Sequence, residues 1–291
     1  MTVAGGGVLD AIVAAVQRGV AERRVRVPFA DLAARVEGGI PKGEAFQRAL
    51  ARSGGVRVIA ECKRRSPSRG VLRRDYDPAA IASAYERAGA AAISVLTEPA
   101  FFDGALAHLE AVTRAVQVPV LRKDFVVDEY QIVEAAAAGA SAVLLIVSAV
   151  GGHDLSRLLR AADRWGVAAL VEVHDAGEIA SAVDRGAGII GVNNRNLRTL
   201  EVAPETAARL VDAIPDACVA VAESGLRTGD HVARLHALGY DAFLVGERFM
   251  TAADPGAAAA AFIDDATRAL SGPKPAVDRA VDPPADRGHV R

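Results

Sequence analysis

The chain has 291 residues, of which 51% are apolar and 24% are charged, so it is long enough to bury a substantial core and too apolar to be disordered throughout. Its 34 Lys and Arg residues are balanced by 36 Asp and Glu residues, and the net charge of −2 provides no basic surface for a nucleic acid. The densest apolar run, at 142–150, is too short to cross a bilayer, so we expect no membrane association.

The two cysteines, Cys62 and Cys218, lie far apart in the sequence and outside any CxxC spacing. This pattern excludes a disulfide framework and a zinc motif, and it is typical of the reducing cytoplasm, where we expect the chain to act. The six histidines form no HExxH or HxH pattern, so no metal site is expected. No residue pattern suggests a bound cofactor.

Eight short apolar or β-branched runs recur along the chain, and each has the length of a buried strand. They occupy residues 56–62, 91–97, 118–125, 142–147, 168–173, 188–193, 218–224 and 242–246. The segments between them, such as 77–89 and 128–139, repeat apolar residues at three and four positions and predict helices. Glycines stand where five of these helices should end in the left-handed conformation, at Gly89, Gly139, Gly166, Gly186 and Gly239.

Strict alternation of strand and helix predicts a parallel sheet of the α/β class. Eight such units favour a closed (β/α)8 TIM barrel over an open doubly wound sheet, and no GxGxxG motif follows the first strand. We expect this barrel to form the catalytic domain, over residues 51–270.

The barrel is expected to have an extension at each end of the chain. Residues 1–50 are predicted to form an N-terminal helical extension packed on the barrel, because one apolar stripe is made by Leu9, Ile12, Val13, Val16 and Val20. Residues 271–291 are rich in proline and poor in large apolar residues, so we expect a disordered tail.

In a TIM barrel the active site lies at the carboxyl ends of the strands. The polar residues that close the predicted strands are Glu61, Lys63, Lys123, Glu172, Asn193, Arg195, Glu223, Ser224 and Glu247. Because side chains alternate along a strand, Glu61 and Lys63 share one face and Cys62 points to the other. Several ionisable groups at one rim indicate a catalytic cluster, and the alternative is a set of ion pairs that only closes the end of the barrel.

The loops after the seventh and eighth strands often hold a phosphate group in this fold. Gly225 and Gly246 stand in these two loops and would let the backbone approach an anion closely, although each also suits an ordinary turn. Together they predict a phosphorylated ligand, to which Lys63, Arg195 and Ser66 would add charge or hydrogen bonds. Phe101, Phe102 and Phe125 near the ends of the second and third strands would form either an aromatic pocket or ordinary core.

Seven segments resemble indole-3-glycerol phosphate synthase of tryptophan biosynthesis, in order and with their spacing kept over about residues 8–265. They are IAECKRRSPSRG (59–70), VLRKDFVVDEYQIVEA (120–135), VLLIV (143–147), LVEVH (170–174), GVNNRNL (191–197), AESGL (222–226) and FLVGERFM (243–250). The ExKxxSPS and LRKDF blocks are specific to this family, whereas AESG and the last VG also occur in other phosphate-binding barrels.

The resemblance implies a (β/α)8 lyase that needs no cofactor. It would close the pyrrole ring of 1-(2-carboxyphenylamino)-1-deoxyribulose 5-phosphate and release carbon dioxide and water. By resemblance, Lys123 is the general acid for ring closure, and Glu172 stabilises the developing positive charge or handles a proton. Lys63 would hold the substrate carboxylate and act as the acid in dehydration, assisted by Glu61 and Asn193.

The resemblance also implies a binding role for a second group of residues. Ser224 would position the substrate, and the phosphate would lie near Gly225 and Gly246 with Arg195. The anthranilate ring would pack against Phe102, Phe125 and Leu144. Glu247 departs from the family pattern, because many relatives have a small hydroxyl residue there. Since a carboxylate repels phosphate, we expect Glu247 to offer only its backbone N–H and to point its side chain away.

Two other functions compete with this interpretation. Another sugar-phosphate TIM barrel, such as phosphoribosylanthranilate isomerase, would need a Cys and Asp pair, and Cys62 lies on the wrong face of its strand. A non-catalytic barrel that binds a phosphorylated metabolite would keep the glycines but would not need Glu61, Lys63, Lys123 and Glu172 together. We expect a small-molecule substrate and a monomer or weak homo-oligomer.

Overall fold

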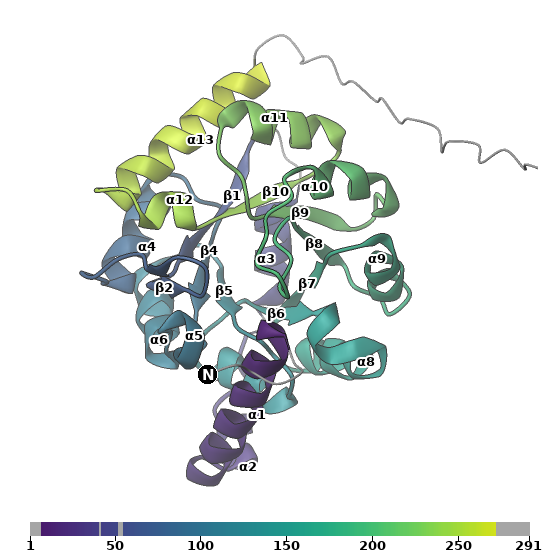
Figure 1. Cartoon of the computed structure of the whole chain (residues 1–291). Helices are drawn as coiled ribbons and strands as arrows, with labels where there is room; N and C mark the ends of the chain where they lie inside the picture. The colour runs from purple at the N-terminus through teal and green to yellow at the C-terminus, as the bar shows by residue number, and fades with distance from the viewer. Residues whose placement is uncertain (1–6, 41, 52–54, 272–291) are drawn as a thin grey trace, which may run out of the picture.

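The computed structural model describes residues 7–40, 42–51 and 55–271. Eight strands close into a barrel in which every neighbouring pair is parallel, and helices surround it (Figure 1), so the predicted (β/α)8 fold is confirmed. Each of these strands lies within the run predicted for it. The barrel strands are β1 (Arg57–Cys62), β4 (Ala92–Leu96), β5 (Val120–Lys123), β6 (Ala142–Ile146), β7 (Ala168–Val173), β8 (Ile189–Asn193), β9 (Val219–Glu223) and β10 (Ala242–Val245).

Helices follow the strands around the barrel. They are α4 (Pro78–Arg87), α5 (Pro99–Phe102), α6 (Leu106–Ala115), α7 (Glu129–Ala137), α8 (Val147–Arg164), α9 (Ala176–Val183), α10 (Glu205–Leu210) with the 3-10 turn η1 (Val211–Ala213), α11 (Gly229–Leu238), α12 (Glu247–Met250) and α13 (Pro255–Ser271).

Local sequence explains where two of these helices begin and end. Asp77 caps α4 by accepting hydrogen bonds from the backbone N–H groups of its first turn, and Asp128 does the same for α7. Gly89 and Gly139 follow these helices with φ of 91° and 85°, the left-handed conformation predicted for them.

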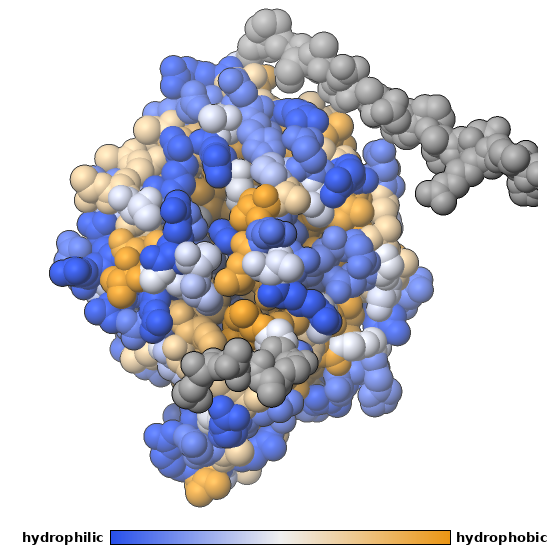
Figure 2. Space-filling model, viewed as in Figure 1, coloured by the Kyte–Doolittle hydropathy of each residue, from blue (hydrophilic) through white to orange (hydrophobic). Residues whose placement is uncertain are grey.

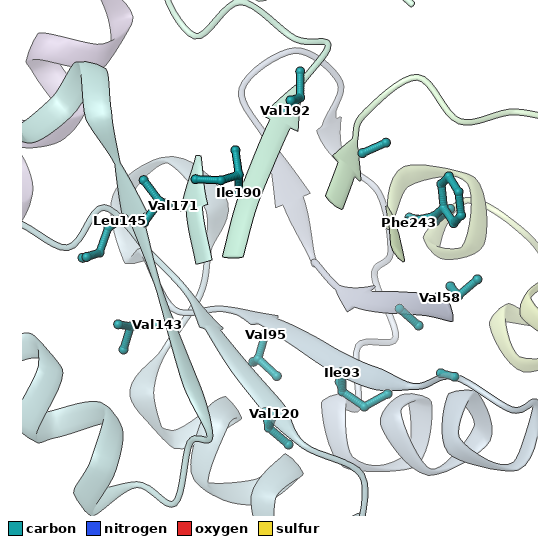
Figure 3. Close-up of a cluster of buried hydrophobic side chains, with 14 of the residues drawn as sticks. Val58, Ile93, Val95, Val120, Val143, Leu145, Val171, Ile190, Val192 and Phe243 are labelled. Atoms are coloured by element: carbon teal, nitrogen blue, oxygen red, sulfur yellow. The ribbon is translucent and has the colours of Figure 1, made fainter. Parts of the chain in front are cut away.

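The alternation of side chains along the strands divides the core into two layers. Side chains on the outer face pack under the helices, and Figure 3 draws a group of them, among which Val58, Ile190 and Phe243 are labelled. Ile59, Leu121, Leu170 and Leu244 belong to the second layer, inside the barrel. The next inward positions along these strands are therefore Glu61, Lys123, Glu172 and Gly246, which lie at the carboxyl end.

Among the described residues, the helices before the barrel are α1 (Val8–Arg26), α2 (Phe29–Ala33) and α3 (Gly43–Leu50). Four of the five residues of the predicted stripe are buried on α1, while Val13 is only partly buried. Phe46 and Leu50 of α3 have no exposed surface and pack in the inner layer beside Ala92, Ala142 and Ala242, small residues at the amino ends of the strands. Helix α3 therefore closes the base of the barrel.

Two features lie outside the sequence prediction. A small hairpin of β2 (Arg65–Ser66) and β3 (Gly70–Val71) follows β1, where the sequence predicted no strand. Ser271, assigned to the tail, ends helix α13, and the rest of the expected tail, 272–291, lies outside the described residues.

None of the described helices is long and apolar enough to cross a membrane.

Candidate active site

Two adjoining cavities open at the carboxyl ends of the barrel strands. The first encloses about 820 Å³ of empty space, its open mouth included, and apolar side chains gather near the centre of the face seen in Figure 2. The predicted residues that line it are Glu61, Lys63, Ser66, Phe102, Lys123, Phe125, Leu144, Glu172, Asn193, Arg195, Ser224 and Glu247. Gly225 and Gly246 line the second, which shares Lys63, Arg195, Ser224 and Glu247 with the first. The fold thus brings all these predicted site residues to one end of the barrel, whereas Phe101, the third aromatic residue named in the sequence, lines neither cavity.

The Lys123 ammonium lies between two buried carboxylates. Its Nζ is 2.9 Å from Oε2 of Glu172 and 3.2 Å from Oε2 of Glu223. Burial lowers the pKa of Lys123, but the carboxylates of Glu172, Glu223 and Glu61 outweigh burial and hold that pKa above its ordinary value. Lys123 is therefore a fixed cation with a proton to donate.

Glu172 is held in its ionised form. Burial raises the pKa of its carboxyl, but Lys123, His174 and the amide of Asn193 together bring that pKa below its ordinary value. Asn193 Nδ2 donates to Oε1 of Glu172 at 3.0 Å, and His174 Nε2 lies 3.5 Å from the same oxygen. The Glu172 carboxylate is thus an anion at neutral pH, suited to stabilise positive charge.

Glu223 belongs to this centre, although the resemblance assigned it no role. Burial raises the pKa of its carboxyl to about 7, against the attraction of Lys123, and the nearby Glu172 carboxylate adds to the rise. A Cβ atom at position 191 would lie 2.2 Å from Oε1 of Glu223, so Gly191 leaves the space that this side chain fills. The sequence had placed Glu223 at the end of the seventh strand, and Val219 and Val221, which occupy the preceding inward positions on β9, agree with that placement.

Replacing Glu223 with glutamine is expected to remove a pH dependence of stability. In the unfolded chain this carboxyl has a pKa near 4.5 and in the folded protein about 7. The stability associated with the bound proton is complete below pH 4.5 and is lost as the pH rises to 7, by roughly 3 kcal/mol at about 1.4 kcal/mol per pKa unit. Urea unfolding at pH 5, 6, 7 and 8 should show Glu223→Gln gaining stability relative to the wild type up to pH 7 and then levelling off. A constant difference between the two proteins would contradict the raised pKa.

Lys63 and Glu61 form a second ion pair at the end of β1. Lys63 Nζ donates to Oε1 of Glu61 at 2.5 Å, with the carboxylate almost fully buried. A Cβ atom at position 246 would lie 2.3 Å from the same Oε1 and 2.9 Å from Cβ of Glu61, so Gly246 also leaves room for this pair. The glycine predicted to let the backbone approach an anion is thus required for side-chain space as well.

The wall of the first cavity is apolar on one side. The rings of Phe102 and Phe125 face each other with centroids 6.0 Å apart at an angle of 39°, and Leu144, Ile146 and Ile12 line the same cavity. Such a surface suits a flat aromatic ring and keeps water from the charged centre, which strengthens its electrostatic interactions.

Two buried polar atoms of the cavity lining lack hydrogen-bond partners among the described residues. They are Oγ of Ser66, on the hairpin, and Oε1 of Glu223. Unpaired buried polar atoms are uncommon in folded proteins, and a polar ligand would satisfy both. This observation favours a binding site over a set of ion pairs that only closes the barrel.

The second cavity carries the features expected of an anion site. Ser224 and Gly225 have φ of 64° and 73°, so the backbone turns sharply at the end of β9. The Arg195 guanidinium is fixed by the carbonyl oxygen of Leu200 at 2.9 Å. The expectation that Glu247 points its side chain away is wrong, because its carboxylate accepts from Arg69 Nε at 2.9 Å and from Arg195 at 3.5 Å. Two arginines hold the carboxylate at the cavity, and the sequence expectation did not include Arg69.

The cysteines lie away from the cavities. Cys62 is fully buried in the outer layer, where burial raises the pKa of its thiol, and Cys218 precedes β9 at the opposite end of the barrel. Cys62 therefore lacks the access to substrate that the isomerase chemistry requires. Within the described ranges, no three His, Cys, Asp or Glu side chains are grouped to hold a metal ion.

Two solved structures with a similar architecture are distant in sequence. A mandelate oxidase mutant with benzaldehyde is 17% identical with a TM-score of 0.59, over 84% of this chain and 94% of the other. Thiamine phosphate pyrophosphorylase from Pyrococcus furiosus is 16% identical with a TM-score of 0.57, over 75% and 98%. These similarities support the barrel fold alone.

Sequence relatives are much closer. Indole-3-glycerol phosphate synthases from Parafrankia and Nocardioides species are each 50% identical, over 85% of this chain and 91% and 95% of theirs. The enzyme of that name from Campylobacter jejuni is 42% identical over 88% of this chain and its own whole length. The family model described as indole-3-glycerol phosphate synthase matches residues 9–262. The chain therefore belongs to the indole-3-glycerol phosphate synthase family.

Proposed function

We propose that the chain converts 1-(2-carboxyphenylamino)-1-deoxyribulose 5-phosphate into indole-3-glycerol phosphate by ring closure, decarboxylation and dehydration. As a member of its family it is a carbon–carbon lyase of tryptophan biosynthesis with a small-molecule substrate. The observation that carries the proposed mechanism is the Lys123 ammonium, held between the carboxylates of Glu172 and Glu223 at the mouth of the barrel.

In the first step, Lys123 Nζ donates its proton to the ketone oxygen of the substrate as the aromatic ring carbon attacks the carbonyl carbon. Charge develops on that oxygen, and a fixed ammonium in a site with little water stabilises it strongly. The ring becomes positively charged, and the ionised Glu172 carboxylate stabilises this charge. The tilted ring pair of Phe102 and Phe125 would hold the ring in position.

In the second step, the carboxylate of the substrate leaves as carbon dioxide, and its bonding electrons restore the aromatic ring. Lys63 then protonates the hydroxyl group formed in the first step, which leaves as water. Glu61 holds the Lys63 ammonium through their ion pair, and Asn193 orients Glu172. Loss of a proton from the nitrogen-bearing ring completes the indole, and Glu223, with a pKa of about 7, is suited to accept or return a proton at neutral pH.

The second cavity would receive the phosphate group. Its backbone at Ser224, Gly225 and Gly246 leaves room for an anion, and Arg195 adds a positive charge. The unpaired Oγ of Ser66 would donate to the substrate. These contacts would place the ribulose chain between the phosphate and the charged centre.

Addition, decarboxylation and dehydration need only proton transfers and charge stabilisation, which lysine and glutamate side chains supply. We therefore propose that the reaction uses no metal or cofactor. We also propose a cytoplasmic enzyme, a monomer or weak homo-oligomer, with no nucleic-acid partner, in line with the near balance of charges and the two separated cysteines.

The test is a fluorescence assay of indole formation with the purified chain and the proposed substrate, with and without EDTA. We expect product at the same rate in both. Isomerisation of phosphoribosylanthranilate in a parallel assay, without indole formation, would instead support the rival isomerase. Substrate binding with no turnover would support a non-catalytic barrel.

A further inference from the structure

The second cavity has a strongly uneven charge lining. Among its described lining residues, Glu247 is the one acid, and the basic residues are Lys63, Arg69, Arg195, Arg227 and Arg248. Such a lining attracts anions and would bind any small anion that reaches it.

The Glu247 carboxylate already forms ion pairs with two of these cations, Arg69 and Arg195. Oε1 accepts from Arg69 Nε at 2.9 Å and Oε2 accepts from Arg195 Nη2 at 3.5 Å, with 29% of the Glu247 side chain exposed. Arg69 comes from the hairpin loop, Arg195 from the end of β8 and Glu247 from the start of α12, so the carboxylate joins three separate segments at the cavity. Nη1 of Arg195 already donates a hydrogen bond to the carbonyl oxygen of Leu200. Nη2 is therefore the group for which Glu247 competes with an incoming anion.

We infer that Glu247 is an internal competitor for the anion subsite and sets its affinity for phosphate. This inference rests on the proposed function, since it takes the second cavity to receive a phosphate group. An anion that enters must first displace the carboxylate from Arg69 and Arg195, which weakens the binding of every anion at this subsite. The full substrate also binds through its aromatic ring and its carboxylate, so its total binding free energy remains favourable. Free phosphate binds through the subsite alone. Glu247 would thus keep the enzyme from being blocked by free phosphate and would ease the release of product.

The decisive variant is Glu247→Gln, which keeps the size of the side chain and removes its charge. We expect inorganic phosphate at pH 8 to bind this variant about three- to tenfold more tightly than the wild type, the range for loss of two partly exposed ion pairs. The KM for the substrate should fall by a similar factor, while kcat should change little. The measurements are the inhibition constant of phosphate and its direct binding by titration calorimetry, on the full chain.

A matched control removes another carboxylate that pairs with an arginine. Glu205 bonds Arg234 at 2.9 Å between α10 and α11, outside both cavities. We expect Glu205→Gln to bind phosphate like the wild type. A general effect of lost negative charge would appear in both variants and would overturn the specific role of Glu247.

The direction in which phosphate affinity changes in Glu247→Gln decides whether the carboxylate competes with phosphate or orients the arginines for it. Weaker phosphate binding by Glu247→Gln would mean that the carboxylate orients the arginines for phosphate, and unchanged binding would mean that it does not compete; either result overturns the inference. Arg195→Met tests the underlying site separately, because it should lose phosphate binding. If phosphate binds Arg195→Met as tightly as the wild type, the proposed phosphate subsite fails. If only Arg195→Met behaves as expected, the inference about Glu247 fails alone.

Discussion

Replacing Lys123 with alanine is expected to lower the turnover of indole-3-glycerol phosphate formation by roughly 10²- to 10⁴-fold, the range for a positioned general acid. Lys123 contacts both Glu172 and Glu223, at 2.9 and 3.2 Å, and it faces the cavity in which the ketone would lie. The measurement is kcat by indole fluorescence under saturating substrate, with substrate binding followed separately.

The alanine variant also leaves two buried carboxylates without their cation. Breaking a buried pair in this way costs roughly 3 to 5 kcal/mol of unfolding free energy, so a loss of activity needs a control for folding. Lys123→Arg is that control, because it keeps the positive charge between the carboxylates. A guanidinium is larger, planar and delocalised, so its N–H groups would not occupy the position of the Lys123 ammonium, and this variant should be more stable than Lys123→Ala and still lack most of the activity. Near-normal turnover of Lys123→Arg would refute the need for an ammonium in this position, and near-normal turnover of Lys123→Ala would refute the whole assignment.

Replacing Glu172 with glutamine is expected to lower turnover by roughly 10²- to 10³-fold, because the neutral amide no longer stabilises the positive ring of the first intermediate. The side chain keeps its shape, but the hydrogen bonds from Lys123 and Asn193 lose their charged acceptor. Single-turnover measurements should place the loss in the chemical step and leave substrate binding less affected.

Glu134→Gln supplies the matched control for Glu172→Gln. Glu134 is an equally buried carboxylate, but it pairs with Arg23 and Arg122 and does not line either active-site cavity. We expect it to lower stability with no comparable loss of turnover by the folded protein. If Glu172→Gln retained more than about a tenth of the wild-type turnover, charge stabilisation by Glu172 would be ruled out as a main source of catalysis.

The sequence by itself determined the barrel fold and most of the residues that lie at its carboxyl end. Each barrel strand lies within a predicted apolar run, and the residues that close these runs line the two cavities. This was possible because strand length, helix period and the alternation of side chains are local properties of the chain. The carboxyl ends of parallel strands meet at one end of the barrel, so position along a strand was enough to predict that Lys123 and Glu172 lie together.

Only the tertiary structure decided how these groups share charge. Glu172 and Glu223 both contact Lys123, yet the pKa of the first is lowered and that of the second is raised to about 7. Burial raises the pKa of both carboxyls, and the difference comes from Asn193 and His174, which lie beside Glu172 and lower its pKa. Likewise, Arg69 and Glu247 are 178 residues apart, and no local pattern could predict their ion pair. Such interactions depend on distances of a few ångströms between segments that meet only when the barrel closes. For this reason the sequence indicated which residues lie at the carboxyl end of the barrel, but not their ionisation or the orientation of Glu247.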